Sequence, residues 1–170
     1  KSTGRHLEPD EVQVGQWRER LNSLGPLPKI GISWRGGLKA KERARRSTQL
    51  QDWLPVLNQA ATFVNLQYGH CKAELTALEQ QSGVLVHQWD DVEPLCDIDN
   101  FYALVCSLDL VISIDNATAH IAGTADVPVW NLLPKRTEFR WMRDRADSPW
   151  YQSMRLFRCR DDIAWVDLLQ

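Results

Sequence analysis

Apolar residues follow two alternating spacings along the chain. Short, nearly continuous apolar runs are typical of strands that are covered on both faces of a sheet. Such runs occur at residues 29–34, 63–67, 84–89, 109–114, 127–133 and 154–158. Between them, apolar residues recur roughly every three to four positions, which favours helices at 8–25, 50–60, 72–83, 100–108 and 116–125 and a last helix beginning at 161.

This alternation predicts the fold class α/β, with a doubly wound parallel sheet and right-handed crossovers. The 170 residues fit one domain, and no internal repeat, low-complexity segment or linker divides them. The chain starts on Lys1 and stops at WVDLLQ within a predicted helix, so both ends read as cuts in a longer protein. We therefore expect residues 1–28 to be an incoming helix and linker from a preceding region, and 29–170 to be the main domain.

The composition narrows the range of partners. A formal net charge of −2 predicts no general affinity for nucleic acid or for membranes. No apolar run is long enough to cross a bilayer and no signal peptide is recognised, so we expect a cytoplasmic protein without a transmembrane segment; peripheral attachment at the inner membrane stays open. The eight tryptophans exceed ordinary usage, and a tryptophan-rich core is favoured over a recognition surface.

Neither the cysteines nor the histidines form a metal-binding pattern. The four cysteines lack C-x-x-C spacing, which argues against a zinc site and against a disulfide scaffold. Reduced and mostly buried thiols are expected instead. The four histidines show no ligand spacing either, so we expect no metal and no cofactor.

The stretch ISIDNATAHIAG at 112–123 ends a predicted strand and begins a predicted helix. Ligands of doubly wound sheets bind at the carboxyl ends of strands, and the free amides and dipole of a helix start attract anions. Asp115 or Asn116 can cap this helix, and Thr118 adds a hydroxyl donor in its first turn. The carboxylate of Asp115 would repel a phosphate, so it suits the hydroxyls of a sugar or ribose, or capping alone.

Small residues and one histidine complete this stretch. Ala117 and Ala119 would let a ligand approach the backbone, whereas Ala122 and Gly123 would let the helix sit close to the sheet. His120 shares a helix face with the first turn and leans back toward it. The alternative interpretation is a capped, tightly packed helix with a histidine in the core.

A second set of candidates follows the first predicted strand. Ser33, Arg35 and Gly36 lie at its carboxyl end in SWRGG, and a basic loop follows that suits a diphosphate. The loop carries Lys39, Lys41, Arg43, Arg45 and Arg46. The alternative is a solvated loop. Neither a Walker loop nor the G-x-G-x-x-G dinucleotide pattern is present.

Five sequence blocks together resemble the nucleotide-sugar-binding half of bacterial glycosyltransferases of the heptosyltransferase type, family 9. The most similar variant is the one attached to tetratricopeptide repeats. The blocks are KIGISWRGG, RRSTQL, FVNLQYG, DIDNFYALVCSLDLVISIDNATAHIAGTADVPVWNLLP and FRWMRDRADSPWYQSMRLFR, and they extend over residues 29–158. Their order and spacing make the resemblance more specific than any one block.

The resemblance implies a GT-B fold, in which a C-terminal Rossmann-like domain binds the donor, a nucleoside diphosphate sugar, without a metal. Donor phosphates and sugar would be held by Asp115, Asn116, Ala117, Thr118 and His120. The phosphates would be approached by Ser33, Arg35, Gly36 and Arg46. Gln67 and Tyr68, within LQYG, would line the side of the base and ribose.

Two departures from the family pattern limit what is carried over. The N-terminal domain, which would bind an acceptor glycan, lipid or protein and supply the catalytic base, is absent, so the fragment alone should bind a donor and transfer nothing. Asn116-Ala117 stands where many heptosyltransferases have Thr-Gly, so heptose is not carried over as the donor sugar. UDP-linked and ADP-linked donors both stay open.

The expected function is donor binding within an inverting, metal-independent glycosyltransferase. The alternative is a non-catalytic nucleotide- or partner-binding module of the same fold within a repeat protein. An unrelated α/β unit of the response-regulator type is disfavoured, because it would require acidic strand ends and these are basic and small.

Overall fold

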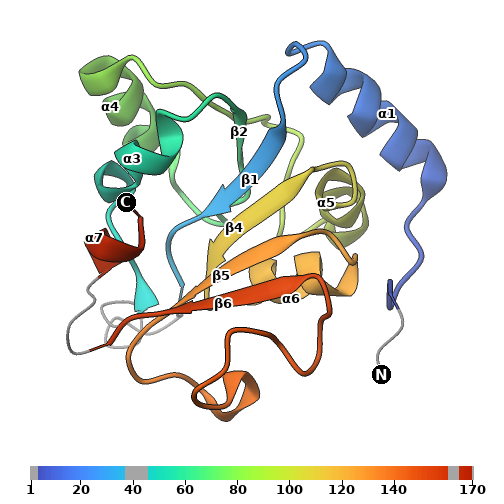
Figure 1. Ribbon diagram of the computed structural model, residues 1–170. Coiled ribbons are helices and arrows are strands. Elements are labelled where there is room, and N and C mark those ends of the chain that lie inside the picture. Colours follow the sequence, from blue (N-terminus) through green and yellow to red (C-terminus); the bar gives the residue numbers. More distant parts are fainter. Residues whose placement is uncertain (1–3, 37–45, 161–164, 170) are drawn as a thin grey trace.

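The computed structural model describes residues 4–36, 46–160 and 165–169. Its six strands form a single parallel sheet in the order β3-β2-β1-β4-β5-β6 (Figure 1). They are β1 (Lys29–Ser33), β2 (Thr62–Asn65), β3 (Val86–His87), β4 (Leu110–Ile114), β5 (Val129–Leu133) and β6 (Met154–Arg158). The chain moves outward from β1 to β3, returns to β4 beside β1, and moves outward again. This order confirms the predicted doubly wound sheet.

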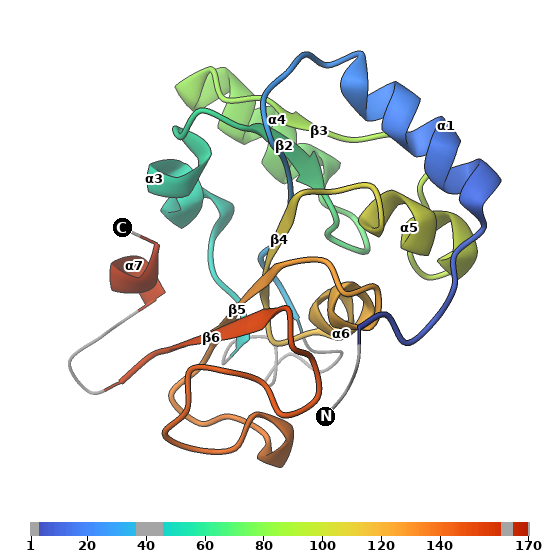
Figure 2. The same ribbon diagram turned by 45° about the vertical axis from the view of Figure 1, so that its right-hand side comes forward.

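Helices cover both faces of the sheet (Figures 1 and 2). One face carries α1 (Glu11–Asn22), α5 (Ile98–Val105) and α6 (Ala117–Thr124), and the other carries α3 (Leu54–Leu57), α4 (Lys72–Ser82) and α7 (Trp165–Leu168). Two 3₁₀ turns, η1 (Leu50–Trp53) and η2 (Phe139–Trp141), complete the described elements. Each layer of helices buries its own hydrophobic cluster against the sheet, which explains why the strands are apolar on both sides.

The first helix belongs to the packed body of the domain. Asp10 caps α1 by accepting hydrogen bonds from the amides of Val12 and Gln13. Trp17 and Leu21, on the opposite side of the helix from solvent, lie in the same core cluster as Phe101 of α5. The helix predicted within the incoming segment therefore contributes to the core of the domain that follows it.

Two elements are shorter than their apolar patterns predict. The predicted helix at 50–60 divides into η1 and α3, because Pro55 fits only the first turn of an α-helix. The predicted strand at 84–89 pairs with β2 only at Val86 and His87. Beyond them, Trp89 leaves the sheet and packs its ring edge-on against Trp17, with 5.2 Å between centroids.

The tryptophans are divided between core and surface. Trp17, Trp34, Trp53 and Trp141 are at most 4% exposed, as a tryptophan-rich core predicts. Trp130 and Trp150 are 43% and 48% exposed, so their rings present area to solvent. Across the described ranges, no helix has the length and apolar character needed to span a membrane.

Candidate ligand-binding site at the switch point of the sheet

The sheet reverses its direction of progression between β1 and β4. Such a switch point is where open α/β sheets bind ligands. Gly36 brings the loops that follow these two strands close together, because a Cβ at this position would lie 3.2 Å from the Cβ of Asn116 and 3.3 Å from the carbonyl oxygen of Asp115. The sequence candidates from both strand ends therefore meet at one place.

Asn116 caps α6 and ties the two strand ends together. Its Oδ1 accepts hydrogen bonds from the Ser113 hydroxyl (3.0 Å) and the Ala119 amide (3.4 Å). Its Nδ2 donates to the Ser33 hydroxyl (2.8 Å) and to the Arg35 carbonyl (3.0 Å). The buried side chain thus uses its full hydrogen-bonding capacity within the protein. The contact of Asn116 with a ligand stays a prediction. Because the side chain is occupied, the contact would have to be made by the backbone of Asn116.

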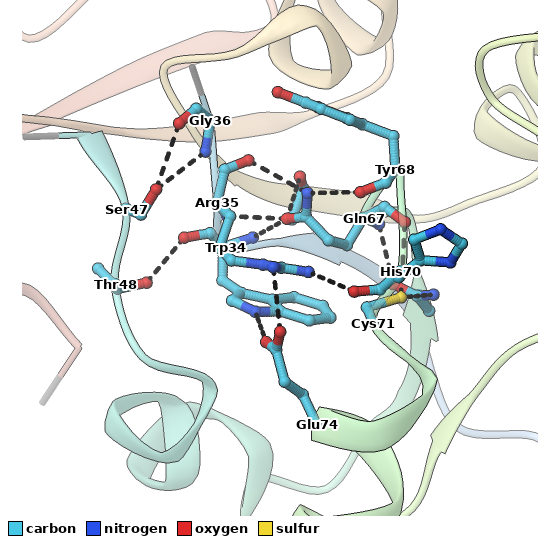
Figure 3. A network of polar contacts seen from close by, with 12 residues as sticks. Trp34, Arg35, Gly36, Ser47, Thr48, Gln67, Tyr68, His70, Cys71 and Glu74 are labelled. Atoms are coloured by element: carbon cyan, nitrogen blue, oxygen red, sulfur yellow. Dashed lines mark hydrogen bonds and ion pairs between the residues drawn. The ribbon is translucent and has the colours of Figure 1, made fainter. Parts of the chain in front are cut away.

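Gln67, just beyond the end of β2, makes a matching set of bonds. Its Oε1 accepts from the Ser33 hydroxyl and from the amides of Trp34 and Arg35, at 3.2, 3.1 and 2.8 Å (Figure 3). Its Nε2 donates to the carbonyls of Arg35 and Tyr68. Gln67 and Ser33 are buried. Ser33, Gln67 and Asn116 together form a satisfied polar frame, hereafter the frame, which fixes the backbone at the switch point.

The guanidinium of Arg35 is directed toward α4 (Figure 3). Its Nη1 lies 3.0 Å from a Glu74 carboxylate oxygen, and its Nη2 donates to the His70 carbonyl (3.2 Å). The indole of Trp34 donates to the other Glu74 oxygen (2.8 Å). Tyr68 contributes its carbonyl to the frame, and its ring lies apart from this network (Figure 3). The predicted phosphate contact of Arg35 would require it to leave Glu74.

The first turn of α6 is open at its start and packed further along. Ala117 is exposed, and Asn116 caps only the Ala119 amide, so the amides of Ala117 and Thr118 lack an acceptor among the described residues. Thr118 is 2% exposed, and its hydroxyl is directed to the Leu66 carbonyl at 3.4 Å. Ala119 is fully buried, so it serves packing and not, as predicted, the approach of a ligand.

Gly123 is small for a different reason from the one predicted. A Cβ at this position would lie 2.5 Å from Cγ of Tyr151, so the glycine makes room for the Tyr151 ring and not for the sheet. The Tyr151 hydroxyl in turn lies 3.1 Å from Nδ1 of His120. The connection between β5 and β6 is thereby packed against α6.

Asp115 lies at the centre of a second group of polar side chains. Its carboxylate is 5% exposed, and Oδ1 accepts from the indole of Trp141 at 2.8 Å. Oδ2 lies 3.8 Å from Nη1 of Arg46 and has no hydrogen-bond partner among the described residues. Arg46 also pairs with Glu138, whose other oxygen pairs with Arg140. The Arg46 hydrogen bond holds the pKa of Glu138 below its usual value.

His120 completes this group, which we call the indole cluster (Asp115, His120, Trp141, Arg46 and Glu138). The imidazole stacks on the Trp141 ring, with 4.9 Å between centroids and 22° between planes. Burial lowers the pKa of His120, against an opposing effect of Asp115, which favours the neutral imidazole. Of the predicted basic loop, Arg46 is described and takes part in the cluster; Gly37, Lys39, Lys41, Arg43 and Arg45 lie outside the described residues.

Two pockets flank the switch point. One, of about 360 Å³, lies beyond the ends of β2 and β3 and is lined by residues including Asn65, Gln67, His70, Lys72, Trp89 and Asp90. The other, of about 540 Å³, lies between α6 and the β5–β6 connection and is lined by His6, His120, Thr124, Phe139, Arg140, Trp150 and Tyr151. Within the described ranges, no group of three or more histidine, cysteine or acidic side chains is arranged to hold a metal ion.

Four residues that line these groups were not among the predicted site residues: Glu138, Trp141, Trp150 and Tyr151. The block FRWMRDRADSPWYQSMRLFR contains three of these four and belongs to the resemblance, but neither its charge nor its aromatic content shows which strand end it faces. Its contact with Asp115 joins residues 26 positions apart and becomes visible only in the fold.

Comparison with known proteins places the chain in a structural context. No family model matches it. Protein FlbA of Caulobacter vibrioides is 37% identical over 161 residues, which are 94% of this chain and 26% of that protein. Two solved structures share the fold with a TM-score of 0.64 and each covers 96% of the chain: E. coli ADP-heptose lps heptosyltransferase II, at 14% identity, and a family 9 glycosyl transferase from Veillonella parvula, at 12%. The chain spans 26% of the length of FlbA and about half of each solved structure, 51% and 49%.

Proposed function

We propose that this chain binds the nucleotide-sugar donor of an inverting, metal-independent glycosyltransferase. The observation that carries the proposal is the open start of α6 beside a buried carboxylate, at the point where the sheet reverses. The fold shared with a heptosyltransferase and a family 9 glycosyl transferase supports the same function. The sequence resemblance further supports a place beside tetratricopeptide repeats in a longer, cytoplasmic protein.

The donor diphosphate would lie on the amides of Ala117 and Thr118. These two groups belong to the first turn of a helix of eight residues, where the helix dipole and the amide hydrogens both favour an anion. Arg46 supplies a positive charge 3.8 Å from Asp115 at the same strand end. The oxygen of Asp115 that has no hydrogen-bond partner among the described residues would accept a hydrogen bond from a hydroxyl of the sugar or ribose. It would not lie against a phosphate, because two negative charges repel each other.

The remaining parts of the donor would extend to either side. The nucleoside would enter the pocket beyond β2 and β3, which Gln67 and the loop carrying Tyr68 border. The leaving group would be UDP or ADP. When an acceptor oxygen attacks the anomeric carbon from the opposite face, the bond to the diphosphate breaks, and the negative charge that develops on it is stabilised by α6 and Arg46.

The acceptor, a glycan, lipid or protein, and the base that removes its proton would come from outside this chain. The chain by itself would therefore bind the donor and transfer nothing.

Calorimetry with UDP, ADP and GDP in the presence of EDTA tests the proposal. At least one nucleotide should bind with millimolar or tighter affinity. Ala117→Asp places a carboxylate beside the proposed phosphate and should weaken binding by about tenfold or more, since like charges repel at close range. Val12→Asp is the matched control, because it adds the same charge to the exposed first turn of α1.

Three results would contradict the proposal in separate parts. Absence of binding by all three nucleotides, both in EDTA and with added Mg²⁺, would remove the donor site. A requirement for Mg²⁺ would remove the metal-independent mechanism. Equal loss of affinity in Ala117→Asp and Val12→Asp would place the phosphate away from α6.

A further inference from the structure

The pocket between α6 and the β5–β6 connection has no role in the nucleotide site beyond its shared wall, His120. Its volume of about 540 Å³ is within the range of small-molecule sites. In Figure 2 the β5–β6 connection (orange to red) lies beside α6, and the segment before α1 runs along the same helix. His6 of that segment donates its amide to the Thr124 carbonyl (2.8 Å), so three chain segments enclose the pocket.

Its aromatic walls are held in place before any ligand arrives. The Trp150 indole donates to the Arg140 carbonyl at 2.8 Å, and the Trp150 amide donates to the Ser148 hydroxyl. The ring is nevertheless 48% exposed, so its position is fixed while its surface stays accessible. Phe139, at 80% exposed, lies under the guanidinium of Arg140 at 5.0 Å. A fixed and accessible aromatic ring is a low-entropy binding surface.

Polar groups are placed around these rings. The Tyr151 hydroxyl and Nδ1 of His120 bond to each other, so Nε2 is the imidazole nitrogen without a partner among the described residues. The Thr124 hydroxyl donates to the His120 carbonyl and keeps its acceptor capacity. The Arg140 side chain is 46% exposed and adds a charged donor. The pocket therefore combines apolar faces with a few fixed hydrogen-bonding groups.

We propose that this pocket binds the ring of a pyranose, with Trp150 as the stacking surface and His120, Tyr151 and Arg140 as partners of its hydroxyls. A pyranose has a face of C–H groups and an edge of hydroxyls, and the pocket offers a complementary arrangement. The inference rests on the proposed function for the source of the sugar. The ring belongs either to the donor or to an acceptor glycan. In the first case the diphosphate of the donor would lie at the start of α6, and His120 would lie between the diphosphate and the ring.

The test titrates ¹⁵N-labelled protein with methyl glycosides of glucose, galactose, mannose and N-acetylglucosamine up to high millimolar concentration. The indole N–H of Trp150 should shift for at least one of them. Trp150→Ala should weaken the binding of that glycoside by about fivefold or more, in line with the loss of one aromatic contact. Trp130→Ala is the matched control, since Trp130 is 43% exposed but packs on Phe157 of β6, away from the pocket.

Two further titrations identify the source of the ring. If the ring is the donor's, UDP-N-acetylglucosamine or ADP-glucose binds more tightly than its nucleotide, and Trp150→Ala removes that difference while leaving the nucleotide affinity intact. If it is the acceptor's, the glycoside binds equally well to protein saturated with nucleotide sugar. Both results support a pyranose site.

The proposal is overturned if no glycoside shifts the Trp150 indole, or if Trp150→Ala and Trp130→Ala change glycoside binding equally. It is also overturned if Trp150→Ala weakens the binding of uridine or adenosine but not that of a glycoside, because the pocket would then hold a nucleobase. Nucleotide binding measured on the same samples reports on the donor site independently, so failure of the pyranose site and failure of the donor site are distinguishable.

Discussion

The two sides of the switch point use their polar residues differently. In the frame, on the side of β1 and β2, Asn116 and Gln67 have their hydrogen-bonding groups occupied by the protein itself. In the indole cluster, on the side of β5 and β6, a buried Asp115 oxygen has no hydrogen-bond partner among the described residues. Two neighbouring residues of one motif therefore differ. Asn116 fixes the backbone at the switch point, whereas Asp115 would be able to accept a further hydrogen bond.

The largest effect expected from this contrast is on stability. Asn116→Ala removes four hydrogen bonds and leaves the Ser33 hydroxyl and the Arg35 carbonyl with fewer partners. The free energy of unfolding should fall by about 3 kcal/mol, measured by urea denaturation. Asn131→Ala is the control, because Asn131 is also buried but, among the described residues, bonds only to the Met154 sulfur and leaves its Oδ1 unpartnered. A cost in Asn131→Ala as large as in Asn116→Ala would contradict the role of the frame.

The next effect tests the indole cluster. Trp141→Phe keeps a ring beside His120 but removes the hydrogen bond to Asp115, and should lower the free energy of unfolding by about 2 kcal/mol. Trp53→Phe is the matched variant, since Trp53 is also fully buried but donates to the neutral hydroxyl of Thr48 at 2.7 Å. Because bonds to charged acceptors are stronger, Trp141→Phe should cost more than Trp53→Phe. Equal costs in urea denaturation would mean that the Asp115 bond adds nothing beyond packing.

The fold was more predictable from the sequence than the site. Strand β6 occupies the same residues, 154–158, that its apolar run predicts, because a buried strand must be apolar wherever it lies. The frame depends on side chains that reach other strands, such as Asn116 bonding Ser33 across 83 positions. No local pattern records such a contact, so polar residues that fix the backbone resemble ligand-binding residues in sequence. Asp115 follows the strand and His120 lies on the next helix, as predicted, but their partner Trp141 was not predicted.

A smaller effect concerns the positive charge of the cluster. Arg46→Ala should weaken binding of a nucleoside diphosphate by about tenfold, while the corresponding nucleoside is little affected, because Arg46 would act on the phosphates. Arg46→Lys keeps the charge and should recover part of the affinity, but not the pairing with Glu138 that a guanidinium provides. Calorimetry on both ligands checks this. Equal losses for nucleoside and diphosphate would move Arg46 out of the phosphate site.

The smallest effect concerns the protonation of His120. Because burial lowers its pKa, the folded protein binds a proton at His120 less readily than the unfolded chain does. Its contribution to stability is therefore complete above the unfolded pKa of about 6.5 and is lost as the pH falls from there through the folded pKa. His87 also has a pKa lowered by burial and by Lys29, but it lies on β3 and not on α6, so His87→Gln is the reference that should not respond to nucleotide.

The measurement compares urea unfolding of the parent, His120→Gln and His87→Gln between pH 8 and pH 5. The parent should lose stability relative to His120→Gln only in the acidic part of that range. A bound nucleoside diphosphate should oppose this loss, because phosphate oxygens near the imidazole favour its charged form and raise the pKa of His120. An NMR titration of the ring with and without nucleotide follows this directly, and an unchanged midpoint would place the diphosphate beyond the reach of His120.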